Sequence, residues 1–264
     1  MNPYKIVFLD IDGTIVTADN SIQESTKEAV RQLQNKGIDV VLATGRPLHE
    51  ISYLVEELHI DSMIGYNGAY GVYRGQCIWK KPLSGPFVEH FLHIAGEYGH
   101  DLVLFSKNRS FWNRIDSPLA AEFMEKFHIQ KNAPLTQPAK DEFLSVNVIT
   151  TGENDYKLYE AFGGVTLARV NIALQKIKYC YDVVRNEANK GKAVKAFLEH
   201  LGIQKEESVA FGDAKNDIEM LKNVGESFAM GNADPELFRY AKHKTTSVED
   251  SGVYNGLKSL GLIE

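Results

Sequence analysis

The sequence predicts an α/β fold in which a doubly wound parallel sheet carries an inserted α+β domain. Short apolar runs alternate with amphipathic helical segments at both ends of the chain, while the middle has a different texture. Strand–helix alternation predicts right-handed crossovers and an open sheet that helices cover on both faces. The 264 residues are enough for one large domain that carries a sizeable insertion.

The first strand and helix are expected at the N-terminus. Residues 5–9 form an apolar run (KIVFL) that ends at Asp10, as in a strand buried on both faces of a parallel sheet. The following helix is expected to begin near Ser21 and Glu24, which form a candidate capping box, and Gly37 can close it.

Later elements follow the same pattern on both sides of a long middle segment. We expect strands at residues 38–43, 63–66, 207–211 and 227–230, and helices at residues 47–58, 190–201, 216–222, 235–241 and 253–260. The middle instead holds amphipathic helices at residues 87–98, 119–127 and 156–162, separated by strands such as 102–105 and 143–149. We therefore expect residues 1–82 and 183–264 to form a Rossmann-like core, and residues 83–182 to form the inserted α+β domain.

Composition and charge exclude several classes of protein. A hydrophobic fraction of 44% and a charged fraction of 24% are typical of a globular chain with a core. The formal net charge of −6 lacks the basic footprint of a nucleic-acid-binding protein. No apolar stretch approaches the roughly 20 residues that span a bilayer, and the N-terminal apolar run is too short for a signal peptide. The two cysteines, Cys77 and Cys180, lie far apart, so we expect a cytoplasmic protein without a disulfide framework.

The first chemical pattern is DIDGT at residues 10–14, directly after the first expected strand. Two carboxylates two residues apart, Asp10 and Asp12, can act as a nucleophile or metal ligand and as a general acid and base. A plain strand-ending turn also fits, because Asp-Gly is a common turn dipeptide. An EF-hand calcium loop fits poorly, since it needs glycine at its sixth position and a preceding helix.

Two further patterns lie at expected helix starts. Thr44 and Gly45 follow the second strand, where a hydroxyl and a backbone N–H suit a phosphoryl oxygen, although Thr44 can equally cap the next helix. Lys190 opens a late helix and offers a mobile positive charge suited to a phosphate, although lysine is also a common surface residue.

The fourth pattern is GDAKND at residues 212–217. Asp213 and Asp217 can both face one hard cation, from a strand end and from the helix that follows, and Mg²⁺ prefers few carboxylates together with water and phosphate. A polar turn capped by Asp213 is the alternative. The four patterns follow one another at strand and helix ends, where ligands bind in open α/β sheets, so their conjunction favours a single site.

Together these patterns resemble those of the haloacid-dehalogenase-like (HAD) superfamily of phosphohydrolases. The resemblance is greatest to its Cof-type branch, in which a large α/β cap is inserted after the second motif. It rests on DIDGT, ATGR, NKG, GDAKNDIEML and FAMGNADPE. The resemblance implies a catalytic core, and a cap that sets substrate specificity.

By position, the resemblance implies that Asp10 attacks phosphorus to form a phosphoaspartate and that Asp12 is the general acid and base. Mg²⁺ would lie on Asp10, on the main chain of Asp12 and on Asp213, with Asp217 supporting it from behind. The groups implied to hold the phosphoryl oxygens are Thr44, Lys190, Asn216 and the backbone N–H groups of Ile11 and Gly45. Asn67 and Gly68 match a family position near the substrate.

The expected function is therefore Mg²⁺-dependent hydrolysis of a small phosphorylated metabolite, without a nucleic-acid or membrane partner. A phosphomutase on the same scaffold is one alternative, because an aspartyl phosphate can return its phosphoryl group to a sugar. A non-catalytic binding protein is the other. Sugar phosphates, nucleotides, phosphorylated cofactors and small phosphoacids all stay open as substrates, because specificity contacts are expected in the cap. The oligomeric state is likewise open.

Overall fold

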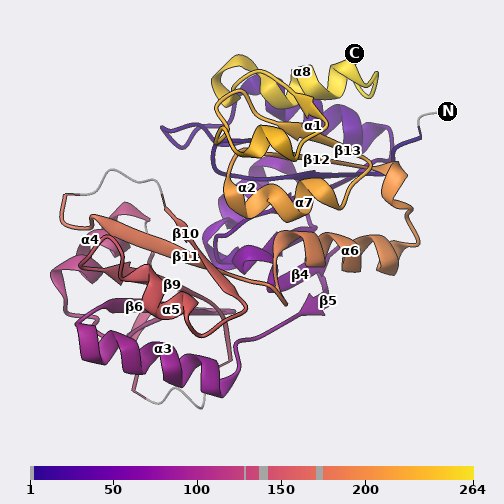
Figure 1. Ribbon diagram of the computed structural model, residues 1–264. Coiled ribbons are helices and arrows are strands. Elements are labelled where there is room, and N and C mark those ends of the chain that lie inside the picture. Colours follow the sequence, from indigo (N-terminus) through magenta and orange to yellow (C-terminus); the bar gives the residue numbers. More distant parts are fainter. Residues whose placement is uncertain (1–2, 128, 137–141, 171–174) are drawn as a thin grey trace. The chain divides into compact units, whose positions relative to one another are not determined.

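The computed structural model describes residues 3–127, 129–136, 142–170 and 175–264. The chain divides into two compact units (Figure 1). The first unit comprises Met1–Gly45, Ser52–Lys80 and Asn189–Glu264, and the second comprises Arg46–Ile51 and Lys81–Ala188.

A sheet with strand order β14-β13-β12-β1-β2-β3-β4-β5 forms the centre of the first unit. The strands from β14 to β3 run parallel, whereas β3, β4 and β5 are antiparallel neighbours. The strands are β1 (Ile6–Leu9), β2 (Asp39–Ala43), β3 (Met63–Gly65), β4 (Tyr70–Tyr73), β5 (Gln76–Lys80), β12 (Ser208–Gly212), β13 (Glu226–Ala229) and β14 (His243–Lys244).

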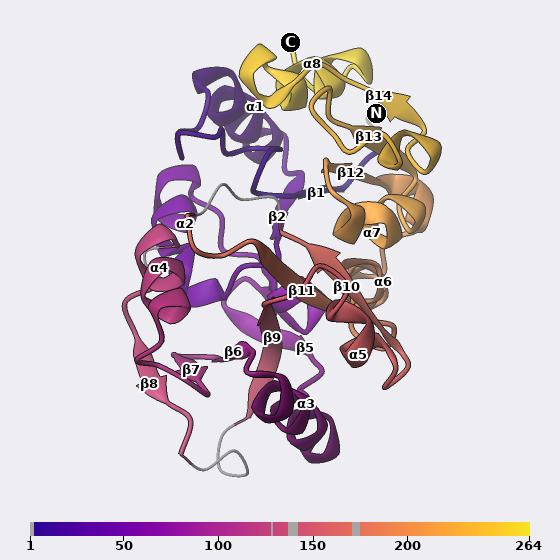
Figure 2. The same cartoon turned by 60° about the vertical axis from the view of Figure 1, so that its left-hand side comes forward.

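Helices cover both faces of this sheet. They are α1 (Glu24–Asn35), α2 (Ser52–Leu58), α6 (Lys190–Leu201), α7 (Ile218–Lys222) and α8 (Gly252–Ser259). On one face, Phe8 of β1 packs in a cluster with Phe197 of α6 and Met220 of α7. On the other face, α8 lies beside α1 (Figure 2), and Gly256 of α8 approaches Phe211 of β12. The expected doubly wound α/β core is confirmed.

The second unit contains a mostly antiparallel sheet with strand order β10-β11-β9-β6-β7-β8, in which only the pair β7–β8 is parallel among the described residues. Its strands are β6 (Asp101–Ser106), β7 (Ser110–Trp112), β8 (Asn132–Pro134), β9 (Phe143–Thr150), β10 (Val165–Arg169) and β11 (Tyr179–Arg185), and its helices are α3 (Gly85–Tyr98), α4 (Pro118–Lys126) and α5 (Tyr156–Glu160). Phe91 of α3 and Tyr159 of α5 pack in one core with Leu104 and Val148 of the sheet. This unit is the expected α+β insertion.

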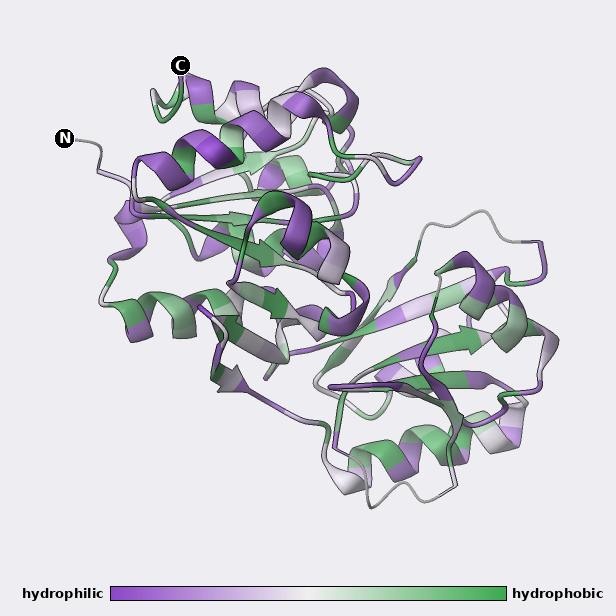
Figure 3. Cartoon of the chain, turned by 180° about the vertical axis from the view of Figure 1, so that it is seen from behind, coloured by the Kyte–Doolittle hydropathy of each residue, from purple (hydrophilic) through white to green (hydrophobic). Residues whose placement is uncertain are grey.

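Hydropathy follows this layering within each unit. In Figure 3 most strands are hydrophobic, whereas the helices alternate between hydrophobic and hydrophilic positions, as amphipathic helices do. No helix in the described part of the chain is long and apolar enough to cross a membrane.

Some local expectations were wrong. The capping box at Ser21 and Glu24 is absent, because the Ser21 hydroxyl hydrogen-bonds instead to Asp19 and Thr17, at 2.8 Å each. The helix expected at residues 47–58 is split into the 3-10 turn Leu48–Glu50 and α2.

The helix expected at residues 235–241 was also wrong, since only the 3-10 turn Leu237–Arg239 forms there. A segment this short forms few of the backbone hydrogen bonds that must offset the cost of helix nucleation.

Candidate active site

Three adjacent parallel strands of the first unit bring the chemical residues to one sheet edge. β1 pairs with β12 on one side and with β2 on the other. Asp10 follows β1, Thr44 follows β2 and Asp213 follows β12, so all three lie at carboxyl ends of neighbouring strands. The backbone N–H of Asp10 donates to the carbonyl of Phe211, 3.1 Å away, and fixes the first of these strand ends.

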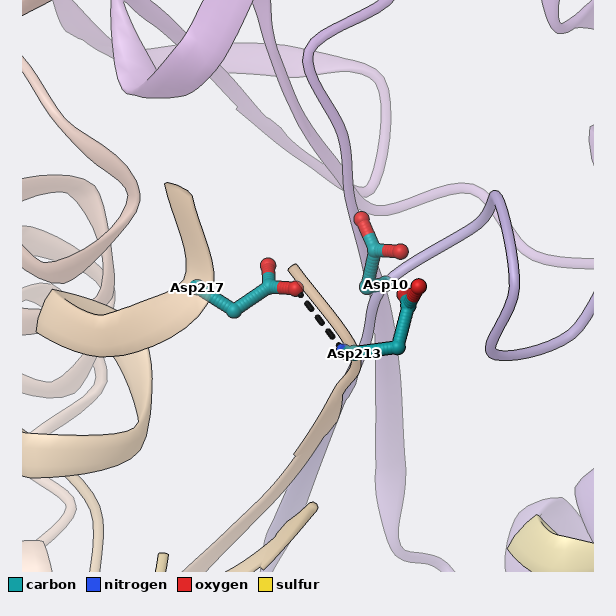
Figure 4. A group of neighbouring side chains, drawn as sticks. All are labelled: Asp10, Asp213 and Asp217. Atoms are coloured by element: carbon teal, nitrogen blue, oxygen red, sulfur yellow. Dashed lines mark hydrogen bonds between the residues drawn. The ribbon is translucent and has the colours of Figure 1, made fainter. Parts of the chain in front are cut away.

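Asp10, Asp213 and Asp217 form a carboxylate cluster at this edge (Figure 4). One oxygen from each lies within 4.8 Å of the others. Burial and the nearby charge of Asp217 raise the pKa of Asp10 well above its ordinary value. The same two causes raise the pKa of Asp213 to about 7. Burial and mutual repulsion therefore both disfavour the ionised forms of Asp10 and Asp213.

Lys190 supplies the positive charge of the site. Its ammonium lies 2.5 Å from Asp10 Oδ1 and 2.6 Å from Asp217 Oδ1, and the side chain is fully buried. Burial disfavours the ammonium, but Asp10 and Asp217 outweigh that effect and raise the pKa of Lys190. The residue is placed by the first turn of α6, which Asn189 caps by accepting a hydrogen bond from the Lys192 N–H at 3.0 Å.

Asp217 has both carboxylate oxygens engaged. Oδ1 accepts from Lys190, and Oδ2 accepts from the N–H groups of Asp213 and Ala214, each at 3.0 Å. Because both oxygens already accept hydrogen bonds, Asp217 is better placed to orient a metal-binding neighbour such as Asp213 than to bind a metal itself. Asp217 thus ties the loop that carries Asp213 to the buried ammonium.

The DIDGT segment holds Asp213 from the other side. Thr14 donates its hydroxyl to Asp213 Oδ1 at 3.2 Å. A Cβ atom at Gly13 would lie 2.4 Å from Asp213 Oδ2, and Gly13 has a φ of +81°, so a side chain there would meet both a clash and backbone strain. Gly13 and Thr14 are site residues that the sequence reasoning did not single out, although both lie inside its first motif.

The remaining candidate residues of this edge form a hydrogen-bonded chain. Asn216 Nδ2 donates to Asn67 Oδ1 at 3.0 Å, and the Asn67 N–H donates to the Thr44 carbonyl at 3.2 Å. Thr44 and Asn67 are buried, at 1% and 3% exposure. Gly68 follows in the same loop and approaches the backbone of Asn189.

Asp12 is exposed and lies outside the carboxylate cluster, although its charge contributes to the raised pKa of Asp10. Ile11, between the two aspartates, is buried, and its carbonyl accepts the N–H groups of Ile15 at 3.0 Å and Val16 at 2.9 Å. Gly45 is half-buried at the end of its segment. Asp12 is therefore the most exposed of the four aspartates at this edge.

The donor set fits a hard divalent cation. Burial raises the pKa values of Asp10 and Asp213, and the nearby charge of Asp217 raises them further, while Lys190 lowers both. Oxygen ligands are what Mg²⁺ prefers, and a cation between Asp10 and Asp213 would offset the repulsion.

Residues 7–257 match the model of a protein family described as haloacid dehalogenase-like hydrolase. The chain belongs to this family. Among its relatives is YkrA of Bacillus subtilis (strain 168), 32% identical over 262 residues, with 98% of this chain and 99% of YkrA covered. Another is the HMP-PP phosphatase of Klebsiella pneumoniae (strain 342), 28% identical, with 88% of this chain and 86% of that protein covered.

Two solved structures are also similar to this chain over its whole described fold. A hypothetical protein from Geobacillus kaustophilus HTA426 superposes with a TM-score of 0.86 at 32% identity, covering 98% of this chain and 100% of its own. The subclass IIB sugar phosphatase BT4131 also has a TM-score of 0.86, at 25% identity and with the same coverage. The expectations of a HAD-like family member, of an enzyme and of a phosphatase are confirmed.

Within this HAD-like phosphatase the structure brings the predicted residues together unevenly. Asp10, Lys190, Asp213 and Asp217 are in direct contact or share one cluster. Thr44, Asn67 and Asn216 are linked by the hydrogen-bonded chain described above. The roles of all these residues, of Asp12, and of the backbone groups at Ile11, Gly45 and Gly68 stay predictions.

Proposed function

We propose that this HAD-like phosphatase hydrolyses a small phosphorylated metabolite, a phosphate monoester, through a phosphoaspartate on Asp10. The observation that carries the proposal is the buried Asp10 carboxylate at a strand end, 2.5 Å from the Lys190 ammonium and beside Asp213. Relatives named as an HMP-PP phosphatase and as a sugar phosphatase support a small phosphorylated substrate.

In the first step, a carboxylate oxygen of Asp10 attacks phosphorus as the bond between phosphorus and the ester oxygen breaks. Asp12 donates a proton to that departing oxygen, which leaves as an alcohol. The exposure of Asp12 places its carboxyl where it can exchange protons with water between turnovers. In the second step, Asp12 takes a proton from water as the water oxygen attacks phosphorus, and Asp10 is released with inorganic phosphate.

Charge neutralisation accounts for the other residues. Lys190 offsets the repulsion between an ionised Asp10 and a phosphate dianion, and Thr44, Asn216 and the backbone N–H groups of Ile11 and Gly45 bind the phosphoryl oxygens. We assign Mg²⁺ to Asp10, the Asp12 main chain and Asp213, with Asp217 holding Lys190 and the Asp213 loop behind them. Mg²⁺ would supply Lewis-acid stabilisation of the transferring phosphoryl group.

We also propose that the core and the insertion expected from the sequence divide chemistry and binding between them. Residues 1–82 and 183–264 would form the catalytic core, because every candidate catalytic residue falls in them. Residues 83–182 would form the cap that recognises the organic part of the ester. We propose a cytoplasmic location for the protein.

The test is hydrolysis of a panel of phosphate esters, with and without Mg²⁺, by the native chain and by Asp10→Asn. The substituted side chain keeps its size and loses the nucleophilic charge. We expect Mg²⁺-dependent phosphate release that disappears in the variant. An active Asp10→Asn protein would exclude Asp10 as the nucleophile, and an inert native chain on every ester would favour a binding role.

A further inference from the structure

The loop Tyr66–Gly68, between β3 and β4, has an unusual backbone. Three consecutive residues, Tyr66, Asn67 and Gly68, have positive φ angles of 56°, 52° and 89°. Asparagine tolerates this region, but an aromatic residue rarely adopts it, so the surrounding structure must hold Tyr66 there. Strain of this kind is concentrated where geometry serves function.

Gly68 lies against the peptide that leads into α6. A Cβ atom at Gly68 would lie 2.1 Å from the carbonyl carbon of Asn189 and 2.2 Å from the carbonyl oxygen of the same residue. It would lie 2.5 Å from the backbone nitrogen of Lys190. On its other side, the loop is held by Trp79, whose indole N–H donates to the Gly68 carbonyl at 2.8 Å. The loop backbone therefore constrains the position of the Lys190 main chain, from which the side chain extends.

Asn67 reaches two further candidate residues. Its side chain accepts from Asn216 Nδ2 at 3.0 Å, and its N–H donates to the Thr44 carbonyl at 3.2 Å. Asn67 is 3% exposed, so little of it is free to contact a ligand. One short loop thus touches the segments that carry Thr44, Lys190 and Asn216.

We propose that the Tyr66–Gly68 loop is a positioning element of the phosphoryl site, in which Gly68 fixes the start of the Lys190 side chain and Asn67 fixes the Asn216 amide. The inference rests on the proposed function, which gives Lys190 and Asn216 their roles. In this proposal Asn67 and Gly68 act by positioning other residues, and not by contacting the substrate directly. A perturbed loop should therefore slow the hydrolysis of every ester by the same factor.

The test compares Gly68→Ala with Gly75→Ala, using two phosphate esters with different organic groups, para-nitrophenyl phosphate and glycerol 2-phosphate. Gly75 also has a positive φ, 78°, but a Cβ atom there would meet nothing within 4 Å. Alanine at residue 75 therefore brings the backbone strain of a positive φ angle but no steric clash. For Gly68→Ala we expect kcat to fall about 100-fold with both esters, because a displacement of 1 Å can cost that much. KM should rise by up to about tenfold, and equally for both esters, because a displaced Lys190 binds the phosphoryl group less tightly. Gly75→Ala should keep kcat within about twofold of the native value.

A second variant, Asn67→Gly, relieves the positive φ and removes the amide that holds Asn216. We expect kcat to fall about tenfold with both esters, the size of effect given by one lost positioning contact. This variant decides the matter if Gly68→Ala does not fold. Losses that differ between the two esters would show that the loop contacts the organic group, and would overturn the proposal. Equal kcat for Gly68→Ala and Gly75→Ala would overturn it too.

Binding of inorganic phosphate in the presence of Mg²⁺, measured by calorimetry, separates this proposal from the proposed function. If the native chain hydrolyses neither ester, the proposed function fails, and phosphate binding then tests the loop alone. Gly68→Ala should weaken phosphate binding about tenfold while Gly75→Ala leaves it unchanged, as expected for a misplaced phosphate-binding lysine. Equal binding by all three proteins, or none, would contradict a positioning role.

Discussion

Asp213→Asn should stabilise the metal-free protein while removing its activity. The substitution keeps the size of the side chain and its acceptor for the Thr14 hydroxyl, and removes one charge from a crowded cluster. Burial and the charge of Asp217 raise the pKa of Asp213 from 3.8 to about 7 in the folded protein. In the folded state, ionised Asp213 is therefore a source of instability.

The magnitude follows from the change in pKa. A group whose pKa is raised by folding favours the native state below the unfolded pKa, and this contribution is lost as the pH rises through the folded pKa. The window for Asp213 runs from 3.8 to about 7. Each pKa unit corresponds to about 1.4 kcal/mol, so replacing the ionised group should yield at most about 4 kcal/mol at pH 8 and less than about 2 kcal/mol at pH 5. Some of this repulsion is shared with Asp10, which makes the first figure an upper limit.

Urea denaturation at pH 5 and pH 8, in the presence of a chelator, measures the effect. Asp116→Asn is the matched control, because Asp116 is exposed and the change in charge is identical. We expect Asp213→Asn to unfold at a higher urea concentration than the native chain, with the larger difference at pH 8. A variant that is less stable at pH 8, or a difference that does not grow with pH, would refute the interpretation of the carboxylate cluster.

Three other perturbations test separate parts of the structure. Mg²⁺ should raise the Tm of the native protein more at pH 8 than at pH 5, because a cation offsets repulsion only between ionised carboxylates; equal shifts would argue against the site. Asp217→Ala should lower the free energy of unfolding by about 1–3 kcal/mol, since the N–H groups of Asp213 and Ala214 lose their acceptor while Lys190 keeps Asp10, and a urea titration that shows no loss would contradict this. Gly191→Ala should cost about 1–3 kcal/mol, because its Cβ would lie 2.4 Å from the Glu219 carbonyl oxygen. Gly96→Ala in α3, with nothing within 4 Å, should be neutral or stabilising by up to about 1 kcal/mol, and similar Tm changes for the two glycine variants would be inconsistent with close packing of α6 and α7.

The features that the sequence could predict depend on local pattern and chain order. The parallel core follows from apolar runs that alternate with amphipathic helices, and α6 has the expected bounds because Asn189 caps its start and Gly202 follows its end. The convergence of Asp10, Thr44 and Asp213 follows from the rule that parallel strands share one carboxyl edge.

The features that could not be predicted depend on contacts between distant segments. Asp213 and Thr14 are 199 residues apart, so the hydrogen bond that joins them leaves no local pattern. The positive φ angle of Tyr66 is imposed by surrounding structure, since an aromatic residue does not prefer that region as glycine does. The β4–β5 hairpin was missed because its burial lacks a regular alternation, and a register shift lies between Gly71 and Val72.

The central claim is that Asp10 carries the phosphoryl group during turnover. It is tested most directly by acid-quenching the Asp12→Asn variant during reaction with radiolabelled para-nitrophenyl phosphate, whose leaving group departs without a proton from residue 12, and mapping the labelled peptide. That variant should accumulate phosphoenzyme, because no carboxylate at residue 12 activates the hydrolytic water. We predict that the label lies on the peptide containing Asp10 and is absent when Asp10→Asn is added. Label on any other residue, or turnover with a fast ester and no labelled enzyme, would contradict the account.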